Sequence, residues 1–429
     1  MTDRPIPNLR WYIAFLLCLS SALNYLDRQT LSVLAETIQR ELKLTTVDYS
    51  YITSSFLVSY TIMYAVSGRL VDFLGTRRSF LIFVSGWSVA NMLHALANTA
   101  LRFSFFRFLL GATEPANFPA GVRAVTEWFP MRERALAIGI FNAGTAVGAA
   151  LAVLVVSFVA LQWGWRWAFV ATGATGFIWV AIWAAFYRLP QEHSRLSPAE
   201  KQLILSDSEG PSESPTGSVP LARLLAMRTT WGCILARVLT DPISYFLSFW
   251  IPKYLQQERG FDLADLGKYI WIPYVALALG NIASGAIPRY LISRGWSLNR
   301  ARKTTMFVVS CLMPVICLTI TRVPSAAMAT ALVTALMFCH AAWGNITIPA
   351  EVFPKQVVGT VSGFGGALGG VAGIITQLTI GWVVQHLSFA PIFAAISVVY
   401  LLAFAAVHLL VGELGTICKI PMDANPAST

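Results

Sequence analysis

Long apolar runs separated by short polar segments make up most of this chain. An α-helix that crosses a bilayer needs about 20 predominantly apolar residues, and the runs have about this length. The pattern therefore predicts an all-α membrane protein with twelve transmembrane helices. The predicted spans are residues 11–33, 49–68, 79–98, 103–122, 135–160, 166–187, 230–254, 268–290, 304–321, 326–349, 357–385 and 389–411.

The longest polar segment lies between the sixth and seventh predicted spans. It contains Ser197-Pro198-Ala199-Glu200, a capping-box pattern with proline at the first helical position, which predicts a short surface helix. The stretch Glu209–Ser218 that follows is too polar and too rich in proline and glycine to fold alone. The segment is predicted to link two six-helix halves. The predicted domains are residues 1–188 for the first half, 189–229 for a cytoplasmic linker, 230–412 for the second half and 413–429 for a cytoplasmic tail.

Composition agrees with a membrane protein and argues against other classes. Only 12% of the residues are charged, against about 25% in a soluble domain. The net charge of +10 comes from basic residues in short loops on the N-terminal side, which the positive-inside rule assigns to the cytoplasm. Nucleic acid is therefore not an expected partner. Most cysteines fall inside apolar runs, so neither a disulfide framework nor a metal site is predicted. We find no nucleotide-binding loop or nucleophile–base motif, and an enzyme is not predicted.

A short sequence repeat relates the two predicted halves. Glu127-Trp128-Phe129-Pro130 recurs as Glu351-Val352-Phe353-Pro354, and each copy joins one span to the next. Corresponding loops with the same pattern indicate an internal duplication, an architecture that many transporters share.

Ionisable residues interrupt three of the apolar spans. A charge at the bilayer centre costs about 2.5–3.5 kcal/mol even on a lenient scale, so each needs a partner charge or a water-filled path. In a duplicated chain the seventh span corresponds to the first, so both halves carry an acid and a base. Two interpretations stay open: a transport site, or a static ion-pair network that holds helices together. The residues are Asp27 and Arg28 in the first span, Arg107 and Glu114 in the fourth, and Arg237 and Asp241 in the seventh.

The chemistry of these residues suits coupled binding of an anion and a proton. Arg28 offers a planar fork that holds a carboxylate with two hydrogen bonds. When a substrate carboxylate occupies Arg28, Glu114 loses its counter-charge and takes up a proton more readily. Proton and anion then promote each other's binding, and this coupling is reciprocal. We assign proton coupling to Asp27 and Glu114, and substrate binding to Arg28 and Glu114.

Polar and aromatic residues in other spans are candidates for contacts with the polar groups and the apolar face of a substrate. Tyr60 and Tyr64 are four residues apart and share one helix face. The alternative for each candidate is an ordinary hydrogen bond between helices. The candidate substrate-binding residues of this kind are Tyr25, Tyr60, Tyr64, Asn142, Thr145, Trp343 and Asn345.

The loop after the second span has the spacing Gly-x-x-x-Asp-x-x-Gly-x-Arg-Arg, formed by Gly68, Asp72, Gly75, Arg77 and Arg78. This resembles the signature of the major facilitator superfamily. The resemblance implies a fold of twelve transmembrane helices in two six-helix halves, with these residues in a gating loop. Gly68 is expected to let helices approach closely, Gly75 to permit a tight turn, and Asp72 to pair with a basic residue or a helix N-terminus. The alternative is an ordinary basic cytoplasmic loop.

A narrower resemblance rests on Asn24–Arg28, Arg107–Glu114 and Glu127–Pro130. These segments resemble the anion:cation symporter family, and bacterial hexuronate transporters in particular are similar nearly end to end. The resemblance implies proton-driven uptake of a small carboxylated sugar by alternating access, with protons as the coupling ion and no cofactor. It also implies that Asp27 pairs with Arg107 and that Arg28 lies near Glu114 and the substrate carboxylate. Aldonate carriers such as galactonate transporters share the acid that precedes Arg28, so hexuronate and aldonate both stay open.

From this resemblance we expect a multi-pass protein of the bacterial inner membrane that functions as a monomer, with both termini in the cytoplasm. An organic-anion exchanger or exporter of the same fold is the first alternative. A transporter-like receptor is a second, against which the acids in both the first and the fourth span argue, because binding alone needs no titrating carboxyl group.

Overall fold

The computed structural model describes residues 5–206 and 221–418. Residues 207–220 of the predicted linker and 419–429 of the predicted tail lie outside the described residues, so the domain boundaries stay predictions. The described chain is helical almost throughout, and its one β-bridge joins Ile6 to Leu196. The predicted all-α architecture is therefore confirmed.

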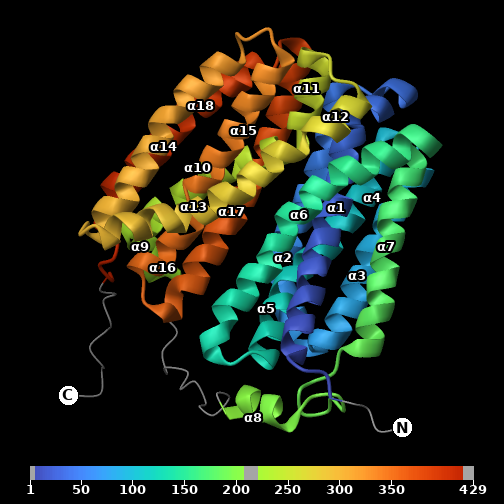
Figure 1. The fold of residues 1–429 in the computed structure, drawn as a ribbon. Helices are drawn as coiled ribbons and strands as arrows, with labels where there is room; N and C mark the ends of the chain where they lie inside the picture. The colour runs from blue at the N-terminus through green and yellow to red at the C-terminus, as the bar shows by residue number, and fades with distance from the viewer. Residues whose placement is uncertain (1–4, 207–220, 419–429) are drawn as a thin grey trace.

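Two sets of helices follow one another along the chain, with α8 and α9 between them (Figure 1). The first set comprises α1 (Leu9–Leu42), α2 (Thr46–Leu74), α3 (Thr76–Leu93), η1 (His94–Leu96), α4 (Ala100–Thr113), η2 (Glu114–Ala116), α5 (Asn117–Trp128), α6 (Met131–Trp163) and α7 (Trp165–Phe186). The connecting helices are α8 (Pro198–Ser206) and α9 (Leu221–Ala226). The second set comprises α10 (Arg228–Phe249), α11 (Ile251–Arg259), α12 (Leu263–Tyr269), α13 (Trp271–Ser293), α14 (Leu298–Ile320), α15 (Ala326–Ala342), η3 (Asn345–Thr347), α16 (Ile348–Val352), α17 (Lys355–His386), α18 (Ala390–Ala406) and a π-helical end at Val407–Val411.

Most of these helices are long enough to cross a membrane. Within residues 5–206 and 221–418, ten helices are long and apolar enough, or eleven if the pair α10 and α11, bent by 57°, is one span. The predicted span at 103–122 is not among them. It is helical, but it is divided into α4, η2 and α5 and carries Arg107 and Glu114, which lower its hydropathy.

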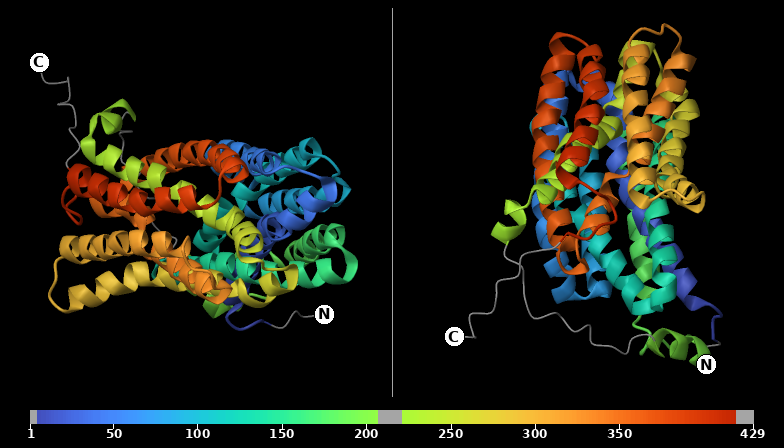
Figure 2. Two further views of the ribbon diagram at one scale, coloured as in Figure 1. Left: turned by 90° about the horizontal axis from the view of Figure 1, so that it is seen from above. Right: turned by 90° about the vertical axis from the view of Figure 1, so that its left-hand side faces the viewer.

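The two sets of helices lie side by side when viewed along the bundle (Figure 2, left). They touch through α2 against α17, α6 against α12 and α13, and α1 against α11. We call the end of the molecule where α1 meets α11 the Lys253 end, and the end where α2 meets α3 the Asp72 end. In Figure 1 the two sets converge at the Lys253 end, at the top, and diverge toward the Asp72 end.

Small residues bring α6 directly against α1, the helix that carries Asp27 and Arg28. A Cβ atom on Gly148 would lie 2.0 Å from the carbonyl oxygen of Ala22, and one on Gly144 would lie 2.1 Å from that of Cys18. Only glycine fits at such a distance, as in other close contacts between membrane helices. The backbone of α1 is therefore held at a fixed place beside α6.

The predicted surface helix is present as α8, but its glutamate has another partner than expected. The Glu200 backbone N–H donates to Ser197 Oγ at 3.2 Å, as in a capping box. The Glu200 carboxylate instead accepts from the backbone N–H groups of Leu9 and Arg10 at 3.0 and 3.1 Å and from Arg10 Nη1 at 2.7 Å. A carboxylate at a helix N-terminus is stabilised by the helix dipole, so α8 caps α1 and stays with the first set of helices.

Candidate transport site

A buried ion pair joins α1 to the break between α4 and α5. Arg28 Nε and Nη2 lie 2.8 and 2.7 Å from Glu114 Oε2. The Glu114 side chain has no exposed surface, and that of Arg28 is 9% exposed. The other oxygen, Glu114 Oε1, has no hydrogen-bond partner among the described residues. The structure thus confirms the predicted proximity of Arg28 and Glu114 and leaves one carboxylate oxygen unused.

The break in the fourth predicted span explains the position of Glu114. Pro115 follows it in the 3-10 turn η2, where α4 has ended and α5 has not begun. Such a break is tolerated at membrane depth where the chain is buried in protein or lines a cavity. Just beyond it, the Asn117 amide holds α1 by accepting from Ser20 Oγ at 2.9 Å and donating to Ser21 Oγ at 3.2 Å.

Aromatic rings surround the guanidinium of Arg28. Its Cζ atom lies 4.5 Å from the ring centroid of Tyr25, 4.8 Å from that of Tyr60 and 5.2 Å from that of Phe56. Tyr64 stacks on Tyr60, with ring centroids 6.2 Å apart and planes 24° apart, which agrees with the shared face predicted from their spacing. Cation–π contacts of this kind stabilise a desolvated arginine by up to about 2 kcal/mol each. The rings also offer a flat surface beside the charge.

Asp27 does not pair with Arg107, and this prediction is wrong. Asp27 Oδ1 accepts from Asn91 Nδ2 at 2.6 Å, and Asn91 Nδ2 also lies 2.8 Å from Thr172 Oγ1. Arg107 Nη1 and Nη2 both donate to the backbone carbonyl of Arg28 at 3.3 Å. Consecutive helix residues point in different directions. Because Arg28 faces Glu114, Asp27 faces α3 and α7 instead.

Asn91 was not among the residues predicted from the sequence, although one signal for it was present. Asn91 is a fully buried amide inside an otherwise apolar helix, α3, and polar side chains in such positions are rare and tend to hold partners on other helices. Its contacts with Asp27 and Thr172 join α3 to α1 and α7. Asp27 Oδ2 has no hydrogen-bond partner among the described residues.

A second ionic cluster lies in the other set of helices. Arg237 Nε and Nη2 lie 2.9 and 2.8 Å from Asp241 Oδ2. The Asn345 amide donates to Thr240 Oγ1 at 2.7 Å and to Asp241 Oδ1 at 3.3 Å. The predicted pair of Arg237 and Asp241 is therefore present, and Asn345 is one of its partners.

The remaining substrate-contact predictions have different outcomes. Asn142 is exposed and Thr145 half-buried on α6, where Thr145 Oγ1 donates to the Asn142 carbonyl oxygen at 2.8 Å. Trp343 is 1% exposed, and its Nε1 donates to Ser310 Oγ at 3.0 Å. Trp343 thus packs against α14 inside the second set of helices, and its role as a substrate contact stays a prediction. The apolar character of its span could not distinguish an interior ring from one that lines a chamber.

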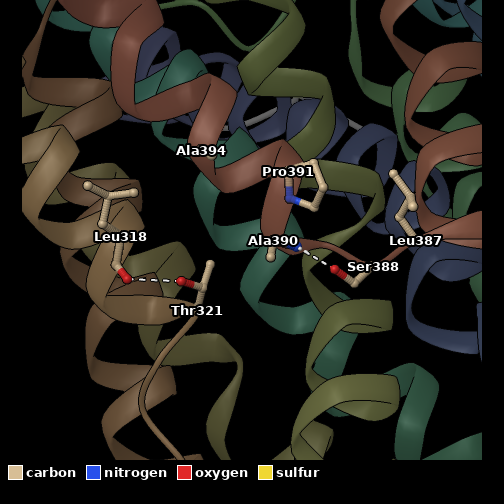
Figure 3. A pocket seen from close by; sticks show the side chains of 7 residues that line it. All are labelled: Leu318, Thr321, Leu387, Ser388, Ala390, Pro391 and Ala394. Atoms are coloured by element: carbon tan, nitrogen blue, oxygen red, sulfur yellow. Dashed lines mark hydrogen bonds between the residues drawn. The ribbon is translucent and has the colours of Figure 1, made fainter.

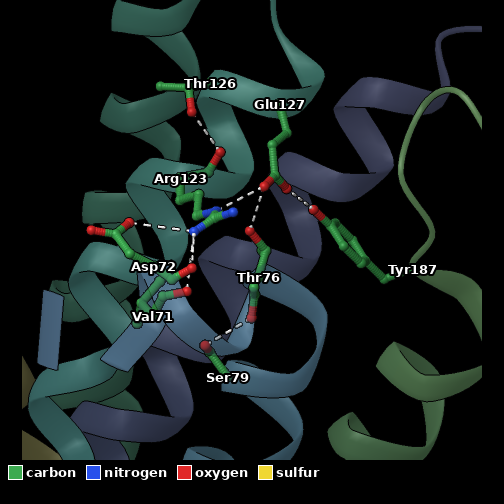
Figure 4. Close-up of polar contacts among 9 residues, drawn as sticks. Val71, Asp72, Thr76, Ser79, Arg123, Thr126, Glu127 and Tyr187 are labelled. Atoms are coloured by element: carbon green, nitrogen blue, oxygen red, sulfur yellow. Dashed lines mark hydrogen bonds and ion pairs between the residues drawn. The ribbon is translucent and has the colours of Figure 1, made fainter. Parts of the chain in front are cut away.

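The predicted gating loop forms the turn between α2 and α3 (Figure 4). Gly75 has φ of +75°, a conformation that suits glycine, and its N–H donates to the Val71 carbonyl at 2.9 Å. Arg77 and Arg78 are both exposed, and Arg77 Nη2 donates to the Ala184 carbonyl oxygen at 2.7 Å. The close helix approach predicted at Gly68 is absent, because no atom lies within 4 Å of a Cβ placed there.

Asp72 has a basic partner, but the strongest acceptor of this region is Glu127. Arg123 Nη1 lies 3.3 Å from Asp72 Oδ1, and the Asp72 side chain is 80% exposed. Glu127 accepts from Arg123 Nε at 3.0 Å, from Thr76 Oγ1 at 2.9 Å and from Tyr187 OH at 2.5 Å (Figure 4). Glu127 therefore ties α3, α5 and α7 together at the Asp72 end.

The sequence repeat has a structural counterpart in the second set of helices. Glu351 stands at the position of Glu127 in the repeated motif, and its Oε1 lies 2.9 Å from Arg302 Nε. Arg302 also donates to the carbonyl oxygens of Ser284 and Gly344 at 3.0 Å each. Each set thus uses its motif glutamate to hold an arginine at the same end of the molecule, which agrees with an internal duplication.

At the opposite end a lysine joins the two sets. Lys253 on α11 has no exposed side-chain surface, and its Nζ lies 3.4 Å from Glu36 Oε2 on α1 and contacts Gln39 Oε1. Gln257 Nε2 donates to the same Glu36 oxygen at 3.0 Å. These contacts could not be predicted from the sequence, because they depend on how the two sets of helices meet.

Two pockets lie at the Lys253 end, away from the ionic residues at the centre. One, of about 590 Å³, has no charged residue in its lining (Figure 3). It is lined by Leu318, Thr321, Leu387, Ser388, Ala390, Pro391 and Ala394. The other, of about 430 Å³, lies between α1, α6 and the α11–α12 region and includes Glu36, Arg40 and Asp262. Neither contains a residue of the predicted transport site.

Comparison with known families gives a match over most of the chain. The profile of the Major Facilitator Superfamily matches residues 17–376. The chain belongs to the major facilitator superfamily. This confirms the predicted fold and identifies a multi-pass transporter-type membrane protein rather than an enzyme.

Curated relatives from this superfamily match the chain nearly end to end. It is 32% identical over 406 residues to the hexuronate transporter of Escherichia coli K12, with 93% of each chain covered. It is 30% identical to a probable galactarate/D-glucarate transporter of the same organism, covering 94% of this chain and 95% of the relative. It is 29% identical to a D-galactonate transporter of Escherichia coli O6:H1, covering 95% and 97%.

Solved structures of major facilitator proteins share the fold. A D-xylose–proton symporter has a TM-score of 0.72 at 15% identity, with 94% of this chain and 98% of that chain covered. A bacterial homologue of the human lysosomal transporter Spinster has a TM-score of 0.71 at 17% identity, with 95% of both chains covered. At these identities the likeness concerns the fold alone.

Proposed function

We propose that this protein is a proton-coupled symporter that imports a sugar acid by alternating access. The observation that carries the proposal is the buried pair of Arg28 and Glu114, in which Glu114 Oε1 has no partner. An arginine with two donors on one carboxylate oxygen can exchange that oxygen for a substrate carboxylate. Glu114, released from its counter-charge, then takes up a proton, and the two binding events favour each other.

The relatives support the substrate class. The three described above are named as transporters of hexuronates, of galactarate or D-glucarate, and of D-galactonate. All these compounds are sugars with one or two carboxylates, and the site has a forked cation with aromatic rings beside it. Asn24 Oδ1, which accepts from Arg28 Nη2 at 3.3 Å, orients the guanidinium further.

The charges of the loops support one orientation of the protein in the membrane. Basic residues such as Arg77 and Arg78 cluster at the Asp72 end, which the positive-inside rule assigns to the cytoplasm. We place both termini on that side of a bacterial inner membrane and treat the monomer as the transport unit. The divergence of the two helix sets at the Asp72 end then corresponds to an inward-open state, and contact at the Lys253 end closes the outer side.

Uptake into proteoliposomes tests the proposal. With an inward-directed proton gradient we expect hexuronate or aldonate to accumulate above its external concentration, and a proton-conducting uncoupler to abolish the accumulation. Arg28→Ala should lose substrate binding itself. Uptake that needs an internal organic anion and ignores the proton gradient would instead identify an exchanger.

A further inference from the structure

Arg237 in the second set of helices holds its carboxylate partner as Arg28 does in the first, although Asp241 lies on the same helix as Arg237 and Glu114 lies on a different segment from Arg28. Both are arginines inside apolar helices, and both place Nε and one terminal nitrogen on a single carboxylate oxygen. The Arg237 side chain is 19% exposed, about twice as much as that of Arg28 at 9%. A charged group at membrane depth that keeps access to solvent is a functional candidate.

Glycines of α17 hold this second pair in place. A Cβ atom on Gly366 would lie 3.1 Å from Arg237 Nη1, and one on Gly369 would lie 2.4 Å from Asp241 Oδ2. Arg237 Nη1 also donates to the Ser362 carbonyl oxygen on α17 at 3.3 Å. Any side chain at these glycines would displace the pair, so the backbone of α17 forms one wall of an arginine site.

The glycine stretch of α17 contacts the surroundings of both arginines. Tyr60 lies over Arg28, and Tyr64 stacks on Tyr60. Thr61, the residue after Tyr60 on α2, faces α17, because a Cβ atom on Gly370 would lie 2.4 Å from Thr61 Oγ1. A Cβ atom on the adjacent Gly369 would lie 2.4 Å from Asp241 Oδ2. The surroundings of Arg28 and of Arg237 therefore approach the same part of α17 from different sets of helices.

We infer that Arg237 is a second anion-binding group and that the site takes a sugar acid with a carboxylate at both ends. The inference rests on the proposed function and narrows its substrate class. A substrate with one carboxylate engages Arg28 and leaves Arg237 on Asp241. A dicarboxylate binds the guanidinium groups of both Arg28 and Arg237. Closure of the two sets of helices around it brings the two arginines toward opposite ends of the substrate. When Arg237 turns to the substrate, Asn345 keeps Asp241 in place and a proton neutralises Asp241, as it neutralises Glu114 in the first pair.

Galactarate and galactonate make a matched pair of probes, because both are open-chain acids and galactarate differs only in carrying a second carboxylate in place of the terminal CH2OH group. Their dissociation constants are measured by calorimetry on the purified full chain. A charge-assisted, forked contact predicts that the wild type binds galactarate about 10- to 100-fold more tightly. The double variant Arg237→Gln/Asp241→Asn removes both charges together, and in it this ratio should fall to about 1.

Two further variants complete the experiment. Arg237→Lys keeps the positive charge but loses the planar guanidinium that makes two parallel hydrogen bonds, and should reduce the ratio of the two dissociation constants about tenfold. If the double variant does not fold, Arg237→Lys tests the inference in its place. Arg166→Gln removes an exposed arginine that pairs with Glu41 at 2.7 Å and should leave the ratio unchanged.

Three results would overturn the inference. If the wild type binds galactonate as tightly as galactarate, or if the variants of Arg237 keep the wild-type ratio, the second anion site is refuted while the proposed function stands. If the wild type binds no sugar acid, the proposed function fails and the inference fails with it.

Discussion

Glu114 Oε2 accepts both hydrogen bonds from Arg28, at 2.8 and 2.7 Å, while Glu114 Oε1 is buried without a partner among the described residues. Removing one member of a buried ion pair costs about 3–5 kcal/mol, because the other charge is left uncompensated. A substrate carboxylate avoids this cost only if it replaces Glu114 at Arg28 while a proton neutralises Glu114. The geometry therefore links anion binding to proton binding.

The packing of α6 on α1 gives a prediction about stability. Gly148→Ala should destabilise the protein by about 1–3 kcal/mol or prevent folding, because its Cβ would lie 2.0 Å from the Ala22 carbonyl oxygen. Gly139→Ala, on the same helix, is the control, since no atom lies within 4 Å of a Cβ there. Thermal unfolding in detergent compares the two. Equal stability of the two variants would show that α1 and α6 are not in close contact.

The turn between α2 and α3 predicts unequal effects of two acids. Glu127→Gln should cost about 1–3 kcal/mol, since Glu127 accepts hydrogen bonds from Thr76 at the start of α3, Arg123 on α5 and Tyr187 just after α7. Asp72→Asn should change stability by less than about 0.5 kcal/mol, because its side chain is 80% exposed and Arg123 keeps its bonds to the Val71 and Asp72 carbonyls. Thermal unfolding measures both. A larger loss from Asp72→Asn would contradict this ranking.

The contact between Asn91 and Asp27 predicts that removing the Asn91 side-chain amide lowers the stability of the protein. Asn91→Leu should destabilise the protein by about 1–3 kcal/mol, because Asp27 Oδ1 and Thr172 Oγ1 both lose the donor at 2.6 and 2.8 Å. Asn98→Leu is the control, since Asn98 accepts only an exposed hydrogen bond from Arg102. Unfolding temperatures measured at one pH decide the matter, and an unaffected Asn91→Leu variant would mean that Asp27 has another partner.

Contact between the two sets at the Lys253 end predicts that a covalent link there blocks transport. The position of a Cβ on Gly267 of α12 lies 3.0 Å from Ser157 Cβ of α6, close enough for a disulfide after a small adjustment. The double variant Ser157→Cys/Gly267→Cys should lose uptake on oxidation and recover it on reduction. Each single variant under the same oxidant is a control. Full uptake by the oxidised, cross-linked protein would mean that this end does not open during transport.

The sequence predicted the membrane spans and the ionisable residues of the candidate transport site better than it predicted which of these residues pair with each other. Apolar run lengths located the helices, and a charge inside an apolar run identified Arg28 and Glu114. The error over Asp27 has a geometric cause. Glu114 and Arg107 both contact Arg28, and consecutive helix residues point in different directions, so Asp27 faces α3 and α7. Which helices pack against that side of α1 depends on the assembled fold.

Other features depended on contacts between distant segments. The pairing of Lys253 with Glu36 requires α11 of the second set to meet α1 of the first. Glu200 of α8 contacts the start of α1, although the whole first set of helices lies between them in the sequence. Neither residue is unusual within its own segment. Polar residues in loops and helix ends are expected in any membrane protein, so only the assembled fold could indicate their partners.

Transport by Glu114→Gln in proteoliposomes tests the central claim most directly. Glutamine keeps a hydrogen-bond acceptor beside Arg28 but cannot carry a proton. We expect this variant to exchange labelled sugar acid across the membrane at a rate near that of the wild type, and to show no accumulation under an inward proton gradient. Accumulation at the wild-type level would contradict the account, because proton coupling would then not pass through Glu114.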